Sequence, residues 1–344
     1  MMLDAVRSRD WVVRPVAEPD LPALLEFAAS LGSGMTTMPA DEAVLAAKIA
    51  TSVASFAGTA EAGSDAFLLV LEELLSGAIL GTSAVYAHVG FPDGFYSYKR
   101  LRLLHRSRSL GLAKSHDQLV LTNEFTGATE VGSLAVRPEY QGSGASRLLA
   151  RARYLLIATA PERFAEVIMA ELRGYQDADG RNAFWDAVGS HFFDMEFAKA
   201  SYLSATRGNE FIAELMPRAA LYLALLPSAA VEVIGRPHPN SAPALHLLRQ
   251  EGFAHHGYVD VFDAGPQVSV NRDDLATVRL SQVLSWREGH LQERPVLLVA
   301  NNDLQRFRVI AATGTPADTL TLGGSEVARL QLDPADRVRV VPVA

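Results

Sequence analysis

The fold prediction depends on the stretch Leu134-Ala-Val-Arg-Pro-Glu-Tyr-Gln-Gly-Ser-Gly-Ala-Ser-Arg-Leu-Leu149. An apolar run typical of a β-strand breaks at Pro138, the chain turns through Gly142 and Gly144, and a helical pattern of apolar residues follows. Glycines let backbone N–H groups come close to an anion, and the first turn of a helix leaves N–H groups without intrahelical partners. The sequence therefore predicts a place to hold a pyrophosphate. An ordinary strand-turn-helix connection would have the same short pattern.

The donors to such an anion are expected from the turn and from the start of the helix. They are Gln141, Gly142, Ser143, Gly144, Ala145, Ser146 and Arg147. Arg151 lies four residues beyond Arg147, so both arginines share one helix face and could reach phosphate oxygens. Two solvated surface arginines are the alternative.

The pattern around this stretch indicates an α/β domain with a mixed sheet flanked by helices. Strands are expected at residues 11–16, 67–72, 78–86, 130–136, 167–172 and 256–262, and helices at 21–28, 41–52, 144–158 and 241–251. After Gly265-Pro266 the sequence pattern changes to short runs rich in Val and Leu, which are typical of β-strands. We therefore predict two domains, a main domain over residues 1–265 and a small β-rich C-terminal domain over residues 266–344.

Composition excludes several classes of function. The chain of 344 residues has no cysteine, which excludes disulfides and a cysteinyl acyl intermediate. Its net charge of −8 argues against nucleic-acid binding, and no run reaches the ~18 apolar residues of a membrane span. A cytoplasmic protein without a membrane or nucleic-acid partner is expected. No metal site is predicted, because adjacent His255 and His256 face opposite sides of a strand.

Two features resemble the GCN5-related N-acyltransferase superfamily, which binds acyl-CoA through Gln/Arg-x-x-Gly-x-Gly/Ala. Gln141, Gly144 and Ser146 occupy the three specified positions, although serine departs from the usual glycine or alanine. Gly252-Phe253 stands where members of the superfamily have such a pair between a helix and a strand. The resemblance implies this acyltransferase fold for the main domain.

A closer resemblance, to the arginine N-succinyltransferase family, rests on segments spread along the chain. They are Gly34-Met-Thr-Thr-Met-Pro-Ala40, Asn123-Glu-Phe-Thr-Gly-Ala-Thr-Glu130, Ala170-Glu-Leu-Arg-Gly174, Phe184-Trp-Asp-Ala-Val-Gly-Ser-His-Phe-Phe193, Phe211-Ile-Ala-Glu-Leu-Met-Pro217 and His238-Pro-Asn-Ser-Ala-Pro243. The resemblance implies direct succinyl transfer from succinyl-CoA, a co-substrate rather than a permanently bound cofactor, to the α-amino group of L-arginine. It also implies a possible oligomer, formed either by copies of this chain or by this chain and a paralogous subunit.

The same resemblance places Leu134 at a succinyl-CoA contact. Backbone amides of its strand, including that of Val136, would donate to the thioester oxyanion and to pantetheine, while the leucine side chain itself is expected in the core.

His238 is the predicted proton donor to the departing thiolate. Many superfamily members use a tyrosine four residues before the glycine of Gly-Phe, but Leu248 stands there and cannot donate. His238 matches the proton donor proposed in the family, and an imidazole titrates near ~6.5. A surface histidine in a tight turn is the alternative.

Glu130 is the predicted base or holder of the acceptor's positive charge. It shares a face with Leu134 if their strand is regular, whereas an exposed strand-end carboxylate is the alternative. Asp194, Glu196, Glu171 and Glu214 are candidates to bind the guanidinium, and Arg173 and Arg100 to bind carboxylates. Trp185, Phe192 and Phe193 are expected in the core.

Two other functions stay open at this point. An ornithine or other basic amino-acid N-acyltransferase would differ from an arginine enzyme by a few contacts. A non-catalytic subunit that serves a catalytic paralogue would keep the fold but lose thioester binding.

Overall fold

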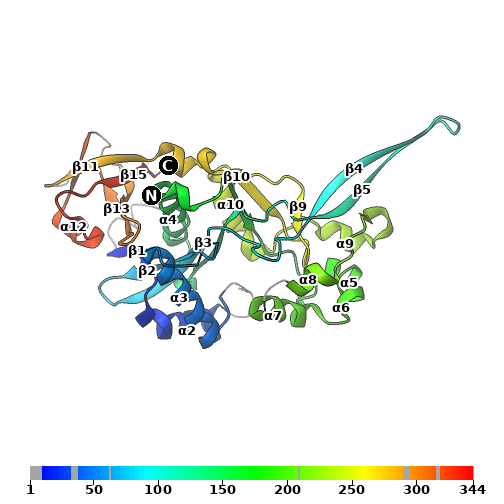
Figure 1. The fold of residues 1–344 in the computed structure, drawn as a ribbon, viewed down its shortest axis with the longest axis horizontal. Helices are drawn as coiled ribbons and strands as arrows, with labels where there is room; N and C mark the ends of the chain where they lie inside the picture. Colours follow the sequence, from blue (N-terminus) through cyan, green and yellow to red (C-terminus); the bar gives the residue numbers. More distant parts are fainter. Residues whose placement is uncertain are drawn as a thin grey trace. The chain divides into compact units, whose positions relative to one another are not determined.

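The structure, a computed structural model, describes residues 10–31, 38–61, 63–207, 210–289, 295–314 and 318–343. The chain forms two packing units, labelled by element in Figure 1. The first unit combines residues up to 88 with residues 131–166 and everything from 271 onward, and the second combines residues 89–130 with 167–270. No helix in the described ranges is long and apolar enough to cross a membrane.

The first unit is built on one sheet with the strand order β6-β3-β2-β1-β13-β12-β15-β11-β14. Phe67 to Leu71 are all buried, as expected for a strand covered on both faces. The elements are β1 (Trp11–Pro15), α2 (Leu21–Ser30), α3 (Glu42–Ala57), β2 (Ala66–Glu73), β3 (Ala78–Tyr86), β6 (Thr129–Val136, from Val131 in this unit), α4 (Ala145–Thr159), α11 (Ala276–Leu280), β11 (Gln282–Glu288), β12 (Val296–Asn301), β13 (Val309–Thr313), β14 (Thr319–Leu322), α12 (Gly324–Leu330) and β15 (Val338–Pro342).

The C-terminal strands share the sheet and the core of the N-terminal strand. Val13 of β1 pairs with Val309 of β13, and Val12 packs in one apolar cluster with residues such as Val299 and Val340. The packing units therefore follow boundaries other than 265/266. The division into domains at residues 1–265 and 266–344 stays a prediction.

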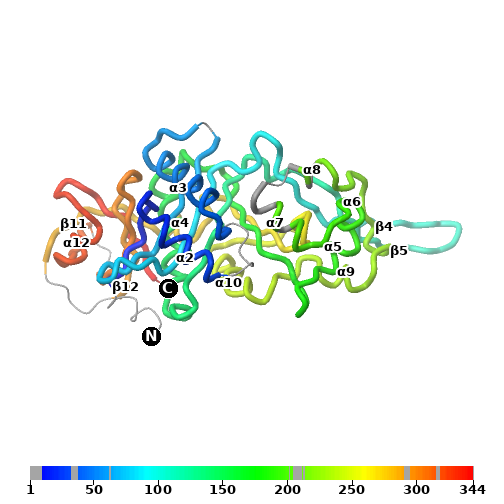
Figure 2. The backbone as a smooth tube through the Cα atoms, turned by 90° about the horizontal axis from the view of Figure 1, so that it is seen from below, coloured from blue at the N-terminus to red at the C-terminus, as the bar shows by residue number. Residues whose placement is uncertain are grey.

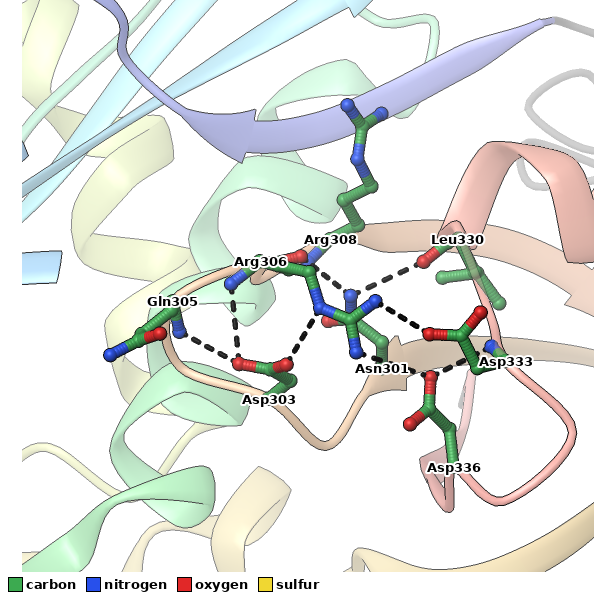
Figure 3. A network of polar contacts seen from close by, with 8 residues as sticks. All are labelled: Asn301, Asp303, Gln305, Arg306, Arg308, Leu330, Asp333 and Asp336. Atoms are coloured by element: carbon green, nitrogen blue, oxygen red, sulfur yellow. Dashed lines mark hydrogen bonds and ion pairs between the residues drawn. The ribbon is translucent and has the colours of Figure 1, made fainter. Parts of the chain in front are cut away.

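A polar network ties the turn between β12 and β13 to the loop after α12 (Figure 3). Arg306 forms ion pairs with Asp303 at 2.9 Å, Asp333 at 3.1 Å and Asp336 at 3.4 Å. Asn301 Nδ2 donates to the Leu330 carbonyl at 3.2 Å. Exposed ion pairs contribute up to about 1 kcal/mol each, so the network positions loops more than it stabilises the unit.

The second unit contains a four-stranded sheet of order β8-β5-β4-β9 and the neighbouring strands β6, β7 and β10. Trp185, Phe184 and Phe262 form the centre of its aromatic core. The elements are β4 (Ser97–Ser107), β5 (Leu112–Thr122), the start of β6, β7 (Val167–Glu171), α5 (Ala183–Ala187), α6 (Ser190–Phe193), α7 (Phe197–Arg207), α8 (Glu210–Leu215), β8 (Leu221–Tyr222), α9 (Ser228–Val233), α10 (Ala242–Gln250), β9 (Tyr258–Asp260) and β10 (Gln267–Asn271).

The predicted mixed α/β class is confirmed, with three local differences. The hairpin β4–β5 was not predicted, and Figures 1 and 2 both show it as a long two-stranded ribbon. The strand expected at 256–262 is limited to β9, because the Asp260 side chain accepts from the amides of Phe262 and Asp263 and turns the chain. Residues 34–37 of the segment Gly34 to Ala40 lie outside the described residues.

Candidate active site

The glycine turn of the first unit has the backbone geometry that its sequence predicts. Gly142 and Gly144 adopt φ angles of +75° and +95°, in the region that favours glycine. Gly144 precedes α4, and its carbonyl accepts the first helical hydrogen bond from Leu148 at 3.0 Å. The strand, the turn and the helix thus follow each other as expected.

Several amides in this turn have no protein acceptor. Within the described chain, the N–H groups of Gly142, Gly144 and Ser146 donate to no carbonyl or side chain. Ser143 is used internally, since its hydroxyl donates to the Tyr140 carbonyl. The backbone therefore offers a group of N–H donors at the start of a helix, which is the arrangement that phosphate groups bind.

The two arginines after the turn have different environments. Arg151 is buried, donating from Nε to the Thr277 hydroxyl and from Nη1 to the Pro342 carbonyl, each at 2.9 Å. The expectation that Arg151 could reach phosphate is therefore wrong, because its guanidinium holds the C-terminal strand. Arg147 is partly exposed.

Strand β6 is irregular just before Leu134. Ser133 has φ +50°, its carbonyl accepts from Thr82 Oγ1, and its hydroxyl contacts the Tyr86 hydroxyl, each at 2.9 Å. The condition of a regular strand, on which the shared face of Glu130 and Leu134 depended, is not met. Leu134 is partly exposed and Val136 is buried, so the side chain of Val136 belongs to the core.

In the second unit, polar and ionisable groups lie around the last residue of β7 and the four residues after it, residues 171–175, which we call the acceptor segment. On one side, His238 N donates to the Arg173 carbonyl at 2.8 Å and Tyr175 N donates to the Arg236 carbonyl at 3.0 Å. On the other side, Gly174 N donates to Asp263 Oδ2 at 2.6 Å. A Cβ at Gly174 would lie 2.4 Å from the Asp263 carbonyl oxygen, so only glycine fits there.

The backbone amide of His238 is fixed by its hydrogen bond to Arg173, and only Nε2 of the imidazole is left without a partner among the described residues. The amide of Asn240 donates to Nδ1 at 3.2 Å, which assigns the ring proton of the neutral imidazole to Nε2. Partial burial, and then the nearby positive charge of Arg173, lower the pKa of the His238 imidazole. Nε2–H is therefore the hydrogen-bond donor of the neutral ring, and the lowered pKa makes the imidazolium form of His238 a stronger acid than an ordinary histidine.

Three carboxyl groups cluster beside the acceptor segment. Burial, with the negative charges of Asp260 and Glu130, raises the pKa of Glu171 well above its usual range. Burial and the neighbouring Asp260 carboxylate raise the pKa of Asp263 to about 8, and burial also raises the pKa of Asp260. Such a cluster favours a proton or a cationic ligand.

Gln267 completes this cluster. It is 1% exposed, its Nε2 donates to Glu171 Oε1, and its own Oε1 has no donor among the described residues. Glu130, paired with Met169 at the start of β6, is half-buried and electrostatically coupled to Glu171. The surroundings of Glu171 are therefore rich in acceptor oxygens and poor in donors.

The other residues predicted to bind the substrate are either exposed to solvent or bound to another side chain of the protein. Asp194, Glu196 and Glu214 are exposed, so Glu171 alone of the four predicted guanidinium partners is partly buried. Arg100 pairs with Asp117 at 2.6 Å, and Arg173 donates to Gln176. Trp185 and Phe193 are buried as expected, but Phe192 is 45% exposed and is not core.

Sequence reasoning missed Asp260, Asp263 and Gln267. The short spacing Asp260-Val-Phe-Asp-Ala-Gly265 is a turn signal that could have ended the predicted strand early. No sequence signal indicated that Gln267 would meet Glu171, because that contact joins residues 96 positions apart.

Comparisons with known proteins agree over almost the whole chain. A family model described as arginine N-succinyltransferase beta subunit matches residues 11–277. The chain is 38% identical over 335 residues to arginine N-succinyltransferase subunit beta of Pseudomonas aeruginosa, spanning 97% of this chain and 98% of that protein. It is 36% identical over 333 residues to arginine N-succinyltransferase of Enterobacter sp., spanning 96% and 97%.

A solved structure is similar in fold over the same extent. It is that of arginine/ornithine succinyltransferase subunit AI from Pseudomonas aeruginosa, with a TM-score of 0.90 and 32% identity. The match covers 98% of this chain and 100% of that one.

Proposed function

Because the chain belongs to the arginine N-succinyltransferase family, we propose that it transfers a succinyl group from succinyl-CoA to the α-amino group of L-arginine. The products are N2-succinyl-L-arginine and free CoA. Full-length similarity to proteins named for this reaction carries the proposal. The absence of cysteine agrees with direct attack of the amine on the thioester rather than with a cysteinyl intermediate.

The glycine turn binds the donor. Its free amides at Gly142, Gly144 and Ser146 suit the pyrophosphate of CoA. The neighbouring residues of the turn and of the first turn of α4 complete the proposed CoA site; they are Gln141, Ser143, Ala145 and Arg147. Backbone groups of β6 at Leu134 and Val136 serve the pantetheine and the thioester oxygen. An oxyanion donor of this kind contributes on the order of 10²-fold or more to the rate.

The acceptor segment binds the amino acid. Glu171 ionises when a positively charged group of arginine replaces the proton that its raised pKa retains. The unpaired Oε1 of Gln267 offers a further acceptor for an N–H of the ligand. An acceptor-rich, donor-poor cluster of this kind selects a cationic substrate.

The protons are assigned to Glu130 and His238. Glu130 takes one proton from the α-ammonium, and the resulting amine attacks the thioester carbonyl. As the C–S bond breaks, the imidazolium form of His238 gives its Nε2 proton to the sulfur, and the second proton lost by nitrogen on amide formation restores the imidazolium. One proton is released overall, and the lowered pKa of His238 makes its imidazolium a stronger acid toward the departing thiolate.

The test is a transfer assay with the purified chain, succinyl-CoA and a panel of L-arginine, L-ornithine, L-lysine and agmatine. Release of free CoA is followed with a thiol reagent, and the cysteine-free chain adds no thiol signal of its own. The expected result is CoA release with arginine and a product heavier by one succinyl group. Agmatine lacks the carboxylate, so it should react poorly. Silence with every acceptor from a folded chain would contradict the proposal.

Two alternatives are each supported by the name of a similar protein. The structure of an arginine/ornithine succinyltransferase subunit supports ornithine as a second acceptor, and a preference for ornithine in the panel would favour it. A relative called subunit beta supports assembly with a paralogous subunit, and activity only after adding that paralogue would favour it.

A further inference from the structure

The hairpin β4–β5 extends beyond the sheet that anchors it. At its base, Ser97 to Lys99 pair with β9, and Gln118 and Leu119 pair with β8. From Leu101 to Asp117, which we call the arm, the two strands pair only with each other among the described strands. Both edges of the arm therefore present unpaired backbone groups, in a ribbon that both views show clearly (Figures 1 and 2).

The arm exposes apolar side chains that nothing in its own unit covers. Leu104 and Leu110 are each 70% exposed, Leu112 is 61% exposed and Leu101 is 37% exposed. A two-stranded hairpin is marginally stable in water by itself, and grouped exposed leucines mark a surface that a partner covers. The arm is therefore built for burial against another surface.

Charge identifies the kind of surface. The arm carries four Arg or Lys residues and one Asp, a net charge of +3, whereas the whole chain carries −8. The remainder of the chain therefore carries −11. Two arms would repel each other, but an arm and the remainder of a second copy attract.

We propose that the arm of one chain packs against the acidic remainder of a second copy of the same chain. In a two-fold dimer each arm makes the same contact with the other copy, so the assembly closes without leaving an arm unpaired. The leucines supply the apolar contact, and Arg106 and Arg108 supply exposed cations, since the one carboxylate of the arm, Asp117, pairs with Arg100 and Arg102. This inference is independent of the proposed reaction.

The first test measures self-association of the full chain by sedimentation velocity at low and high salt. The wild-type chain should form a dimer that weakens as salt screens the charges. Arg106→Glu with Arg108→Glu, and separately Leu104→Ser with Leu112→Ser, should each raise the dimer dissociation constant at least about 10-fold. A monomeric wild-type chain, or arm variants that associate as the wild type does, would overturn the proposal.

Matched controls separate the arm from general changes of charge or apolarity. Arg249→Glu with Arg279→Glu changes the net charge equally at exposed positions outside the arm. Leu75→Ser with Leu225→Ser removes leucines that are 86% and 82% exposed elsewhere. Both controls should stay within about 2-fold of the wild-type dissociation constant. Equal weakening by a control pair would also overturn the proposal.

A cross-link then identifies the surface that the arm contacts, without destabilising the arm. Leu110→Cys introduces the only thiol in the chain, which can carry a photoactivated cross-linker. In a mixture of isotopically light and heavy chains, cross-links from the arm to residues outside 101–117 of the other copy are expected. Cross-links only between two arms, or only within one chain, would contradict the proposal. Capture of added nucleic acid in place of a second copy would do the same.

Discussion

In the proposed reaction the glycine turn and the acceptor segment bind opposite charges, the turn through backbone groups and the segment through side chains. The turn offers an anion the free backbone amides of Gly142, Gly144 and Ser146, which depend on two positive φ angles. The acceptor segment offers a cation the side chains around Glu171, which depend on burial and on contacts between distant parts of the chain. An anion site made of backbone is therefore local in the sequence, whereas a cation site made of carboxylates is not.

Substitution of His238 should give the largest effect and tests the acceptor segment as the place where protons move. We expect His238→Ala to lower kcat by about 10²-fold or more while the Kd of succinyl-CoA changes less than about 3-fold, because general acid catalysis contributes this much and the glycine turn is unchanged. Steady-state kinetics and isothermal titration calorimetry measure the two quantities.

His256→Ala is the matched control for His238, because His256 is an exposed histidine in the same unit. It should keep wild-type kcat. If His238→Ala also keeps it, His238 has no part in the reaction.

Glu171→Gln tests the charge of the acceptor segment alone. Glutamine keeps an oxygen for the Gln267 amide but removes the negative charge that a bound cation would pair with. The KM for arginine should rise about 10- to 100-fold, as expected for loss of a charge-assisted hydrogen bond, with a smaller change in kcat. Glu196→Gln, at an exposed position, should leave KM unchanged. A loss confined to kcat would instead identify Glu171 as the base.

Gly142→Ala tests the other region, the backbone site. Alanine at φ +75° is strained by about 1 kcal/mol and should displace the amides that face the anion. We expect succinyl-CoA to bind about 10-fold more weakly, measured by calorimetry, while the KM for arginine stays near wild type. Gly180→Ala is the matched control, since Gly180 has φ +77° and open space for a Cβ. Equal loss of CoA affinity in both variants would mean that strain, and not the anion site, causes the loss.

The comparison also explains what could be predicted from the sequence. The strand, the turn and the helix of the anion site follow from apolar spacing and two glycines within one short stretch, and the structure has them as expected. The pairing of Val13 with Val309 brings the C-terminal strands into the sheet of the first unit, and no local pattern encodes that pairing. The arm escaped prediction because Arg and His interrupt its apolar alternation on both faces.

The carboxyl cluster could not be predicted for a related reason. Asp260, Asp263 and Glu171 have the sequence environment of ordinary turn and strand-end residues. Their raised pKa values come from loss of water around carboxyl groups that lie close together, and that environment depends on the tertiary fold.

The smallest expected effect concerns how this cluster couples stability to pH. Asp263 keeps its proton in the folded chain up to a pKa of about 8, whereas in the unfolded chain it ionises near ~4. Between those values the folded state binds one more proton, so the free energy of unfolding falls as pH rises, by up to about 1.4 kcal/mol per pH unit from this group, and levels off above pH ~8. The acceptor segment thus becomes less stable toward alkaline pH, while the glycine turn has no such group.

Asp260→Asn should weaken this dependence. The asparagine oxygen can still accept from the amides of Phe262 and Asp263, while its NH₂ can donate to the Asp263 carboxylate in place of a repelling charge. The pKa of Asp263 then falls, and each unit of that fall adds up to about 1.4 kcal/mol to the free energy of unfolding at pH ~8 and almost nothing at pH ~4. Urea unfolding at both pH values measures the difference. Asp177→Asn is the control, because Asp177 accepts from the amides of Asp179 and Arg181 in an exposed turn, and its effect should be the same at both pH values. If Asp260→Asn destabilises the chain equally at both pH values, the carboxyl cluster only shapes the turn and does not hold the proton that a cationic substrate would replace.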